Sequence, residues 1–156
     1  TFSLAAGLNW KGIDFSILLQ GAARSSIYLQ QDIAWDNFWG NYYEEHIGRW
    51  TPETAATATY PRFTKAATAA HPNYYKSDYW LKDSKYLRLK NIQLGYTIPR
   101  KLLKKFGVRS LRVYANAYNL FTWDNVKKVD PESSNNSNGQ FYPQQKVINF
   151  GINLNF

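Results

Sequence analysis

The sequence predicts an all-β protein, and more closely a stretch of transmembrane antiparallel β-barrel wall. Apolar and polar residues alternate along several segments, which is typical of strands with one apolar face. These segments run for about 10–13 residues, longer than usual soluble strands and long enough to cross a bilayer obliquely. The connections between them are alternately short and long, as in outer-membrane barrels with short periplasmic turns and long outer loops.

The first two strands are predicted on either side of a Lys11-Gly12 turn. Even positions from Phe2 to Trp10 are apolar, and the odd positions between them are small or polar. The alternation resumes after the turn, with apolar residues at odd positions from Ile13 to Leu19. Because a tight turn separates the two runs, we expect them to form a hairpin.

A region from about residue 24 to 85 follows, without sustained periodicity and rich in aromatic residues. Around residues 35–47 the pattern indicates a short helix. A connection of about sixty residues far exceeds the usual length of a loop, so we expect it to be functional or folded in its own right.

The third strand is predicted over residues 86–98. Its second half alternates cleanly, but Leu87 and Leu89 are out of phase with it, and a bulge near Asn91 would explain the slip. The segment after Pro99 predicts one helical turn that ends at Gly107.

Two further strands complete the pattern. Residues 110–123 predict the fourth strand, and a polar connection of about 124–144 leads to the fifth. The fifth strand alternates most strictly, because every second residue from Ile148 to Phe156 is apolar and each residue between them is Asn or Gly.

Five strands cannot close a barrel, and an open edge in lipid leaves backbone groups unsatisfied at several kcal/mol each. We therefore expect further strands from upstream sequence or from another chain. The alternation alone leaves one alternative open. A soluble antiparallel sheet with a long decorated loop would show the same one-sided pattern.

The net charge of +8 does not predict nucleic-acid binding. Residues 86–123 carry eight basic and no acidic side chains, whereas the remaining chain has eleven of each sign. Five of the eight fall between Arg100 and Arg109, which indicates a solvated turn or a contact with an anionic surface. Such a cluster is too small for a nucleic-acid groove, so we expect no nucleic-acid partner.

No catalytic set is evident, and we expect neither an enzyme nor a cofactor. The chain has no cysteine, which excludes thiolate chemistry. Its mean hydropathy of −0.51 and the lack of a run of 18 apolar residues argue against a transmembrane helix. The two histidines, His46 and His71, lie in the long connection, one of them beside Glu44 and Glu45. No spacing of these groups, or of Asp32 and Asp36 with them, matches a metal site, so we expect no bound metal.

Several segments resemble the C-terminal portion of SusC-like TonB-dependent transporters of Bacteroidota. They are NWKGIDFSILLQGA, RWTPE, SDYWLKDSKYLRLKNIQLGYTIPRKLLKKFGVRSLRVYANAYNLFTW and the ending YPQQKVINFGINLNF. The segments occur in the order and spacing of that family and together span nearly the whole chain. The resemblance is densest over residues 77–123 and 142–156.

The resemblance implies a barrel of about 22 strands with an N-terminal plug and a TonB box. It implies import of glycans, oligosaccharides or peptides across the outer membrane, together with a SusD-like surface lipoprotein that acts as a lid. Residues 1–156 would supply the last five or so strands, with outer loops at about 24–85 and 124–144. The partners would then be the remaining barrel and plug, the lid, TonB through the N-terminal part, outer-membrane lipid and the glycan or peptide substrate.

Three sets of site residues follow. The resemblance implies that the last strand carries the β-signal that the insertion machinery reads, at Phe150, Ile152, Leu154 and Phe156. Aromatic residues of the long loop are candidates for contact with ligand or lid: Trp35, Trp39, Tyr42 and Tyr43. We expect them to pack the loop onto neighbouring loops or the lid protein rather than to contact ligand directly. Polar positions of the strands are lumen-facing candidates that could touch substrate or plug: Asp14, Gln20, Arg112, Tyr114 and Tyr118.

Two functions of other classes stay open at this point. One is a soluble carbohydrate-binding β domain whose loop aromatics grip glycans. The other is a different outer-membrane barrel, such as a siderophore receptor or a barrel enzyme.

Overall fold

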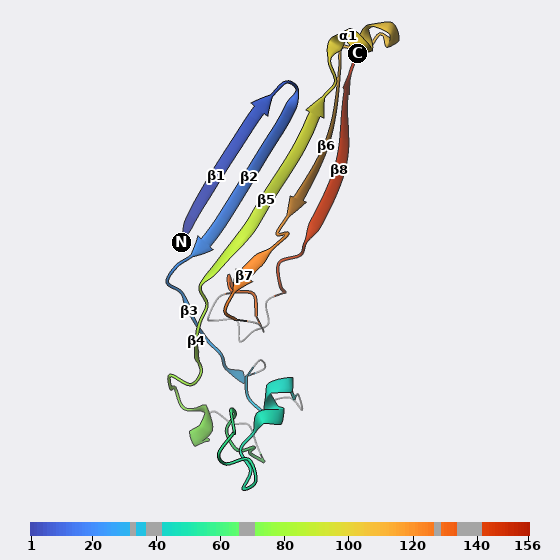
Figure 1. Ribbon diagram of the computed structural model, residues 1–156. Helices are drawn as coiled ribbons and strands as arrows, with labels where there is room; N and C mark the ends of the chain where they lie inside the picture. The colour runs from blue at the N-terminus through green and yellow to red at the C-terminus, as the bar shows by residue number, and fades with distance from the viewer. Residues whose placement is uncertain (32–33, 37–41, 66–70, 127–128, 134–141) are drawn as a thin grey trace. The chain divides into compact units, whose positions relative to one another are not determined.

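The computed structural model describes residues 1–31, 34–36, 42–65, 71–126, 129–133 and 142–156 (Figure 1). The chain divides into two compact units. Unit 1 comprises residues 1–25, 84–125 and 143–156, and unit 2 comprises residues 26–83 and 126–142.

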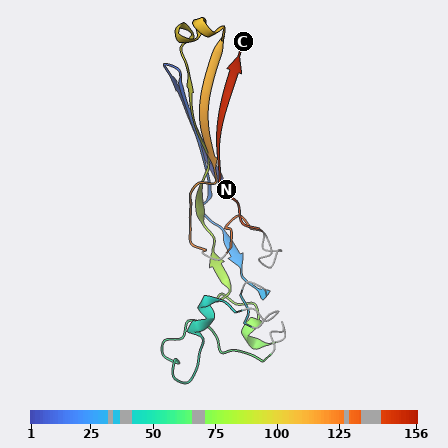
Figure 2. The same ribbon diagram turned by 90° about the vertical axis from the view of Figure 1, so that its right-hand side faces the viewer.

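Unit 1 is one antiparallel sheet. Its long strands lie in the order β1-β2-β5-β6-β8, and the short strand β7 pairs with β5. Seen edge-on in Figure 2, the long strands form a single layer. Their bounds are Phe2–Trp10 (β1), Ile13–Ala22 (β2), Tyr86–Thr97 (β5), Ser110–Tyr118 (β6), Thr122–Asp124 (β7) and Val147–Asn155 (β8). The predicted hairpin and the third and fifth strands are therefore confirmed, whereas the predicted fourth strand is divided into β6 and β7.

The two short connections of unit 1 lie at the same end of the sheet. Trp10 pairs with Ile13, and Ile13 pairs in turn with Tyr96, so the β1–β2 turn lies beside the end of β5. Between β5 and β6 the chain makes one turn of α-helix, α1 (Arg100–Leu103), and one of 3₁₀-helix, η4 (Lys104–Phe106). Gly107 ends it with φ +71°, a left-handed conformation that glycine adopts without strain.

The predicted bulge in the third strand is confirmed. Leu18 pairs with Asn91, but its neighbour Leu19 pairs with Leu89, so Lys90 is an extra residue on β5. The insertion changes the phase of the strand. As a result, Leu89 lies on the same face of the sheet as Leu19, and the leucines on both sides of the bulge share one face.

The fourth predicted strand, residues 110–123, is divided into β6 and β7. Asn119 has φ +50° and interrupts the ladder, and its N–H donates to the carbonyl of the bulge residue Lys90 at 3.1 Å. Strand β7 then pairs with β5 beyond the bulge, with Trp123 opposite Leu87. The interruption in one strand thus matches the extra residue in its neighbour.

Unit 2 contains two paired strands, β3 (Ser26–Tyr28) and β4 (Leu81–Asp83), and two 3₁₀ turns, η2 (Glu44–Gly48) and η3 (Pro72–Tyr74). Of the short helix predicted over residues 35–47, the described residues contain the η2 turn. Unit 2 has its own apolar cluster, which consists of Ile27, Leu29, Ala34, Trp35, Tyr60, Tyr74, Trp80 and Val126. Among the helices formed by the described residues, none is long and apolar enough to span a membrane.

Candidate functional site

The sheet of unit 1 has one apolar and one polar face. Cross-strand pairing aligns apolar residues in rows, such as Leu8, Phe15, Leu94, Ala115 and Phe150. On this face Phe150 is 82% exposed and Ile152 is 70% exposed. A soluble sheet would cover such a face with a second layer, because each large apolar side chain left in water forfeits about 1.5–3 kcal/mol.

The four residues of the predicted β-signal share this apolar side of the chain's last strand. Phe150, Ile152 and Leu154 pair with residues of β6 on the apolar face, and all four side chains are exposed. Their recognition by an insertion machinery stays a prediction.

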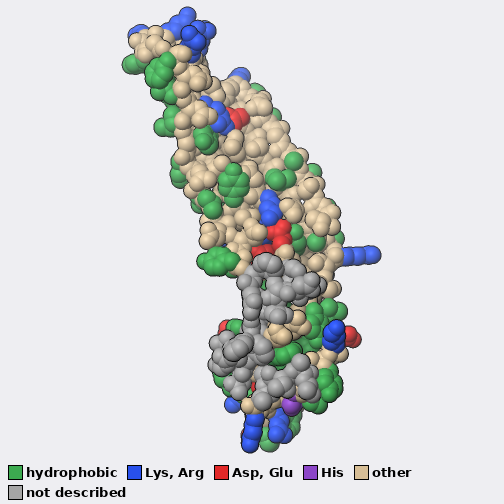
Figure 3. Space-filling view, turned by 180° about the vertical axis from the view of Figure 1, so that it is seen from behind, with side chains coloured by type: hydrophobic (Ala, Val, Ile, Leu, Met, Phe, Trp, Pro, Cys, Tyr) green, Lys and Arg blue, Asp and Glu red, His purple; other side chains and the backbone are tan. Residues whose placement is uncertain are grey.

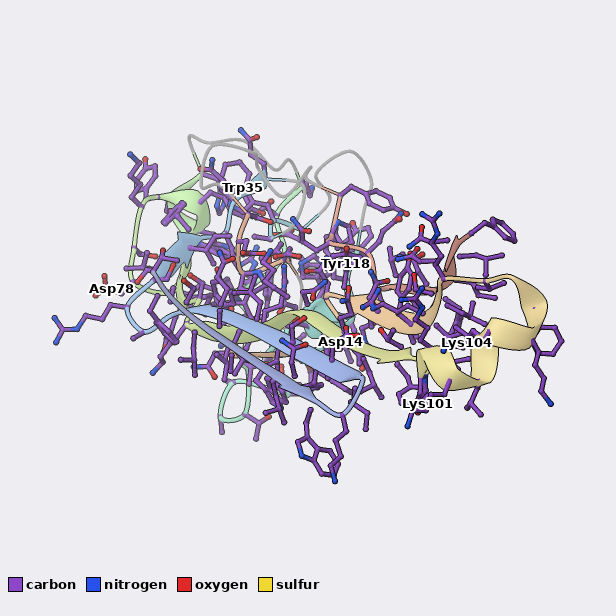
Figure 4. All side chains as sticks on the ribbon, turned by 90° about the horizontal axis from the view of Figure 1, so that it is seen from above. Asp14, Trp35, Asp78, Lys101, Lys104 and Tyr118 are labelled. Carbon is purple, nitrogen blue, oxygen red and sulfur yellow. The ribbon has the colours of Figure 1, made fainter. Side chains whose placement is uncertain are left out.

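The opposite face carries all five lumen-facing candidates. Asp14, Tyr114 and Tyr118 lie on it through their pairing with Gly95 and Asn91 of β5. The two remaining candidates lie on the same face. Gln20, opposite Arg88, is an even number of residues from Asp14 on β2, and Arg112, opposite Thr97, is two residues from Tyr114 on β6. Figure 4 looks along the strands and labels Asp14 and Tyr118. The structure thus brings these residues to one polar face, and their contact with a lumen stays a prediction.

An ion pair lies across the middle strand of this face. Arg112 of β6 donates from Nε to Asp14 Oδ1 at 2.9 Å and from Nη2 to Asp14 Oδ2 at 2.5 Å. The two side chains are separated by β5 and meet above Gly95. A Cβ at Gly95 would lie 2.5 Å from Asp14 Oδ1 and 2.6 Å from Arg112 Nη2. The absence of a side chain at residue 95 therefore makes room for the pair.

A second glycine makes room for Tyr114. The Arg112 guanidinium lies 4.8 Å from the centre of the Tyr114 ring, a cation–π contact. Tyr114 pairs with Gly151 of β8, and a Cβ there would collide with the tyrosine ring. Sequence reasoning did not single out Gly95 or Gly151. Their positions inside strands were an available signal, since glycine in a strand often marks a close approach.

Arg88 is a further residue that the sequence did not single out. It is buried, its Nε donates to Thr122 Oγ1 at 2.9 Å, and its guanidinium lies 5.8 Å from the Tyr86 ring centre. Beside the ion pair, the Asn116 side chain donates to Tyr118 OH at 3.4 Å. The Asn116 side-chain oxygen is buried and accepts no hydrogen bond from the described residues.

In unit 2 the aromatic cluster surrounds a buried carboxylate. Asp36 is nearly inaccessible to solvent, and its carboxylate accepts hydrogen bonds from Tyr74 OH and from the Thr64 N–H. Tyr60 OH accepts from the Asp36 N–H at 3.0 Å and donates to the Ala34 carbonyl at 2.8 Å. Burial, followed by the nearby Asp36 carboxylate, raises the pKa of Tyr60 and Tyr74 above that of a free phenol.

The four loop aromatics proposed for contact differ in their surroundings. Trp35 is 4% exposed and stacks on Tyr74 with ring centres 4.5 Å apart, which favours packing within the loop over ligand contact. Trp39 lies outside the described residues. Tyr42 is 56% exposed, and its ring lies 5.4 Å from Phe63. Tyr43 is partly buried, and its ring packs edge-on against His46. Tyr42 is the described candidate with the most accessible side chain.

His46, the histidine beside the two glutamates of the long loop, makes structural hydrogen bonds inside unit 2. His46 is buried, and its Nδ1 accepts from the Tyr43 N–H at 3.0 Å. Its Nε2 therefore carries the proton and donates to the Ala34 carbonyl at 3.2 Å. Within the described ranges, no three His, Asp or Glu side chains are grouped so that they could hold a metal ion.

A single antiparallel layer with an exposed apolar face and a polar face held by an ion pair defines a piece of membrane barrel wall. No protein-family model matches the chain. The chain is similar to the TonB-dependent receptor P26 of Formosa agariphila, with 29% identity over 99% of this chain and 17% of the relative. It is also similar to the TonB-dependent receptor SusC of Bacteroides thetaiotaomicron, with 26% identity over 98% of this chain and 15% of SusC.

Two solved structures have the same fold. The RagAB peptide transporter matches with a TM-score of 0.73 and 24% identity, covering 96% of this chain and 16% of that chain. The RagAB peptide importer in its open-open state matches with a TM-score of 0.72 and 22% identity, covering 99% and 17%. The predicted resemblance to SusC-like TonB-dependent receptors and the all-β barrel fold class are thus confirmed. The chain spans about one sixth of the length of the relatives it matches.

Proposed function

We propose that this chain supplies wall strands and outer loops of a TonB-dependent importer of glycans, oligosaccharides or peptides in the outer membrane. The observation that carries the proposal is the exposed apolar face of unit 1, which Phe150 and Ile152 exemplify. In hydrocarbon such a face is stable, and the similarity to TonB-dependent receptors supports that environment.

The topology supports an assignment of the two membrane sides. Both short connections of unit 1 lie at one end of the sheet, and the long connections of about 24–85 and 124–144 leave from the other. Outer-membrane barrels have short turns in the periplasm and long loops outside. Unit 2 is then extracellular, where it can meet a lid lipoprotein and arriving cargo.

The polar face then lines the lumen and contacts the plug. The Asp14–Arg112 pair, whose side chains are partly exposed, offers charged groups to such a partner. Two of the lumen-facing candidates, Tyr114 and Tyr118, would add ring edges and a hydroxyl to the same surface.

The test uses the full-length receptor in its native host. Membrane fractionation is expected to place it in the outer membrane, and affinity purification is expected to recover a SusD-like lipoprotein with it. Uptake of labelled oligosaccharide and labelled peptide is compared in cells with and without the gene. Uptake that continues without the receptor or without TonB would refute the proposal. Gene-dependent uptake of a ferric siderophore alone would assign a different cargo.

Contact by the loop is tested with Tyr42→Ala. We expect this variant to lower cargo uptake or recovery of the lid, because Tyr42 exposes an aromatic face on unit 2. Tyr75→Ala is the matched control, since Tyr75 belongs to the same unit and is equally exposed. Equal behaviour of the two variants would contradict a contact role for Tyr42.

A further inference from the structure

The connection between β5 and β6 carries a concentration of positive charge. Its exposed cations are Arg100, Lys101, Lys104, Lys105 and Arg109. Figure 3 shows Lys and Arg side chains gathered at this end of unit 1. Unit 1 has two acidic residues. Asp14 is bound to Arg112, and Asp124 lies beyond the bulge at the opposite end of β5, paired with Tyr86. No acidic side chain of unit 1 is therefore available to neutralise these five cations.

The same connection exposes two large apolar side chains. Leu102 is 65% exposed and Phe106 is 76% exposed, whereas Leu103 between them is 6% exposed and holds the connection onto unit 1. Leu102 lies in the α-helical turn and Phe106 in the 3₁₀ turn that follows it directly, so each turn of the connection carries one exposed apolar side chain. Figure 4 labels Lys101 and Lys104 on this segment. Cations combined with an exposed apolar pair are typical of segments that lie in a membrane interface.

The position of the connection relative to the apolar face supports this interpretation. Trp10 and Tyr96 lie in the same cross-strand row at this end of the sheet, and both are exposed. Trp and Tyr mark the level of the lipid headgroups in membrane proteins. The connection follows Tyr96 by a few residues, so it begins where the hydrocarbon-facing surface ends.

We infer that α1 and η4 form an interfacial anchor that binds anionic phospholipid at the periplasmic leaflet. Leu102 and Phe106 enter the part of the acyl chains next to the headgroups. The phosphate groups of the lipids are contacted by Lys101, Lys104 and Lys105. An anionic lipid is favoured over a zwitterionic one because each cation near a charged membrane surface adds attraction. The inference rests on the proposed outer-membrane function, which places the sheet in a bilayer.

The first experiment measures depth in the full-length receptor, reconstituted in nanodiscs of phosphatidylethanolamine and phosphatidylglycerol. A nitroxide attached through a single cysteine replaces Phe106 in one variant and Phe150 in another. Power-saturation spectroscopy reports whether each label meets oxygen in hydrocarbon or a nickel chelate in water. We expect both labels to lie in hydrocarbon, with the label at residue 106 nearer the headgroups. If residue 150 is in lipid but residue 106 is in water, the anchor is refuted alone. If both are in water, the membrane placement itself is refuted.

The second experiment measures lipid preference with spin-labelled phosphatidylglycerol and phosphatidylcholine. Replacing Lys101, Lys104 and Lys105 together by Gln is expected to lower the relative association constant for phosphatidylglycerol by at least about fivefold. The matched control replaces three exposed lysines of unit 2, Lys65, Lys76 and Lys82, by Gln. Heat-modifiable electrophoretic mobility verifies that each variant is folded. An unchanged preference in the first variant, or an equal loss in the control, overturns the inference.

Discussion

A lysine placed on either face of β8 would distinguish hydrocarbon from water most directly. Phe150 is 82% exposed on the apolar face, and its neighbour Asn149 is exposed on the polar face. The two positions are adjacent, so Phe150→Lys and Asn149→Lys place the same charge at nearly the same depth on opposite sides. Phe150→Ala measures the loss of the ring by itself.

The geometry of β8 sets the expected magnitude. Its nine residues, at about 3.3 Å rise and about 45° tilt, span roughly 21 Å along the membrane normal. With the strand centred in the bilayer, Phe150 is one residue from its centre and lies about 2 Å from the midplane. A lysine facing lipid at that depth costs about 2–4 kcal/mol. Asn149→Lys is expected to cost about 0.5 kcal/mol or less, because the proposed function places the polar face toward the water-filled lumen.

The assay is denaturant unfolding of the full-length receptor in phosphatidylcholine vesicles, followed by tryptophan fluorescence and by heat-modifiable electrophoretic mobility. The decisive quantity is the difference in the free energy of unfolding between the two lysine variants, after subtraction of the Phe150→Ala effect. Equal costs for the two variants, or a larger cost for Asn149→Lys, would show that Phe150 does not face hydrocarbon.

Three further outcomes are expected. Gly95→Ala destabilises the receptor, because the added methyl displaces the Asp14–Arg112 ion pair. The loss of stability is smaller when Asp14 and Arg112 are both alanine, and a double-mutant cycle of unfolding free energies measures the difference. Tyr60→Phe costs about 1–3 kcal/mol, since it leaves the buried Asp36 N–H without its acceptor, and hydrogen exchange in unit 2 reports it. Because the folded-state pKa values of Tyr60 and Tyr74 lie above the unfolded value near 10, their contribution is complete below about pH 10 and declines as pH rises further. An additional rise in tyrosinate absorbance when the protein unfolds above pH 10 checks this.

The long strands could be predicted because a sheet with two different environments imposes a strict two-residue period. The alternation from Ile148 to Phe156 fixes which side chains share a face, whatever surrounds the strand. The bulge was visible for the same reason, since Leu87 and Leu89 fell out of phase with the rest of β5. The break at Asn119 was not, because Phe121 and Trp123 remain in phase across it.

Unit 2 could not be predicted in the same way. Without a period, nothing in the sequence separates a buried aromatic such as Trp35 from an exposed one such as Tyr42. Likewise, the paired strands β3 and β4 are three residues each, too short to show alternation. Their pairing depends on contacts between residues more than fifty positions apart.

The sequence predicts which residues lie on the polar face but not which of them contact one another. The two-residue alternation of each strand is enough to place Asp14 and Arg112 on the polar side. Their meeting above Gly95 depends on the order of strands, which brings β2 and β6 to either side of β5. A glycine in an alternating strand indicates a close approach, and the pairing partner determines which side chain makes it.

The extra residue in β5 determines which changes of strand length the fold tolerates. Deleting Lys90 would join two stretches of regular ladder whose leucines already share a face, so the remaining pairs with β2 could be kept. Deleting Gln93, three residues away, would rotate every following side chain to the opposite face as far as Thr97. One-residue shortening of β5 is therefore expected to keep the pairing with β2 when Lys90 is removed, and to reverse the faces of residues 94–97 when Gln93 is removed.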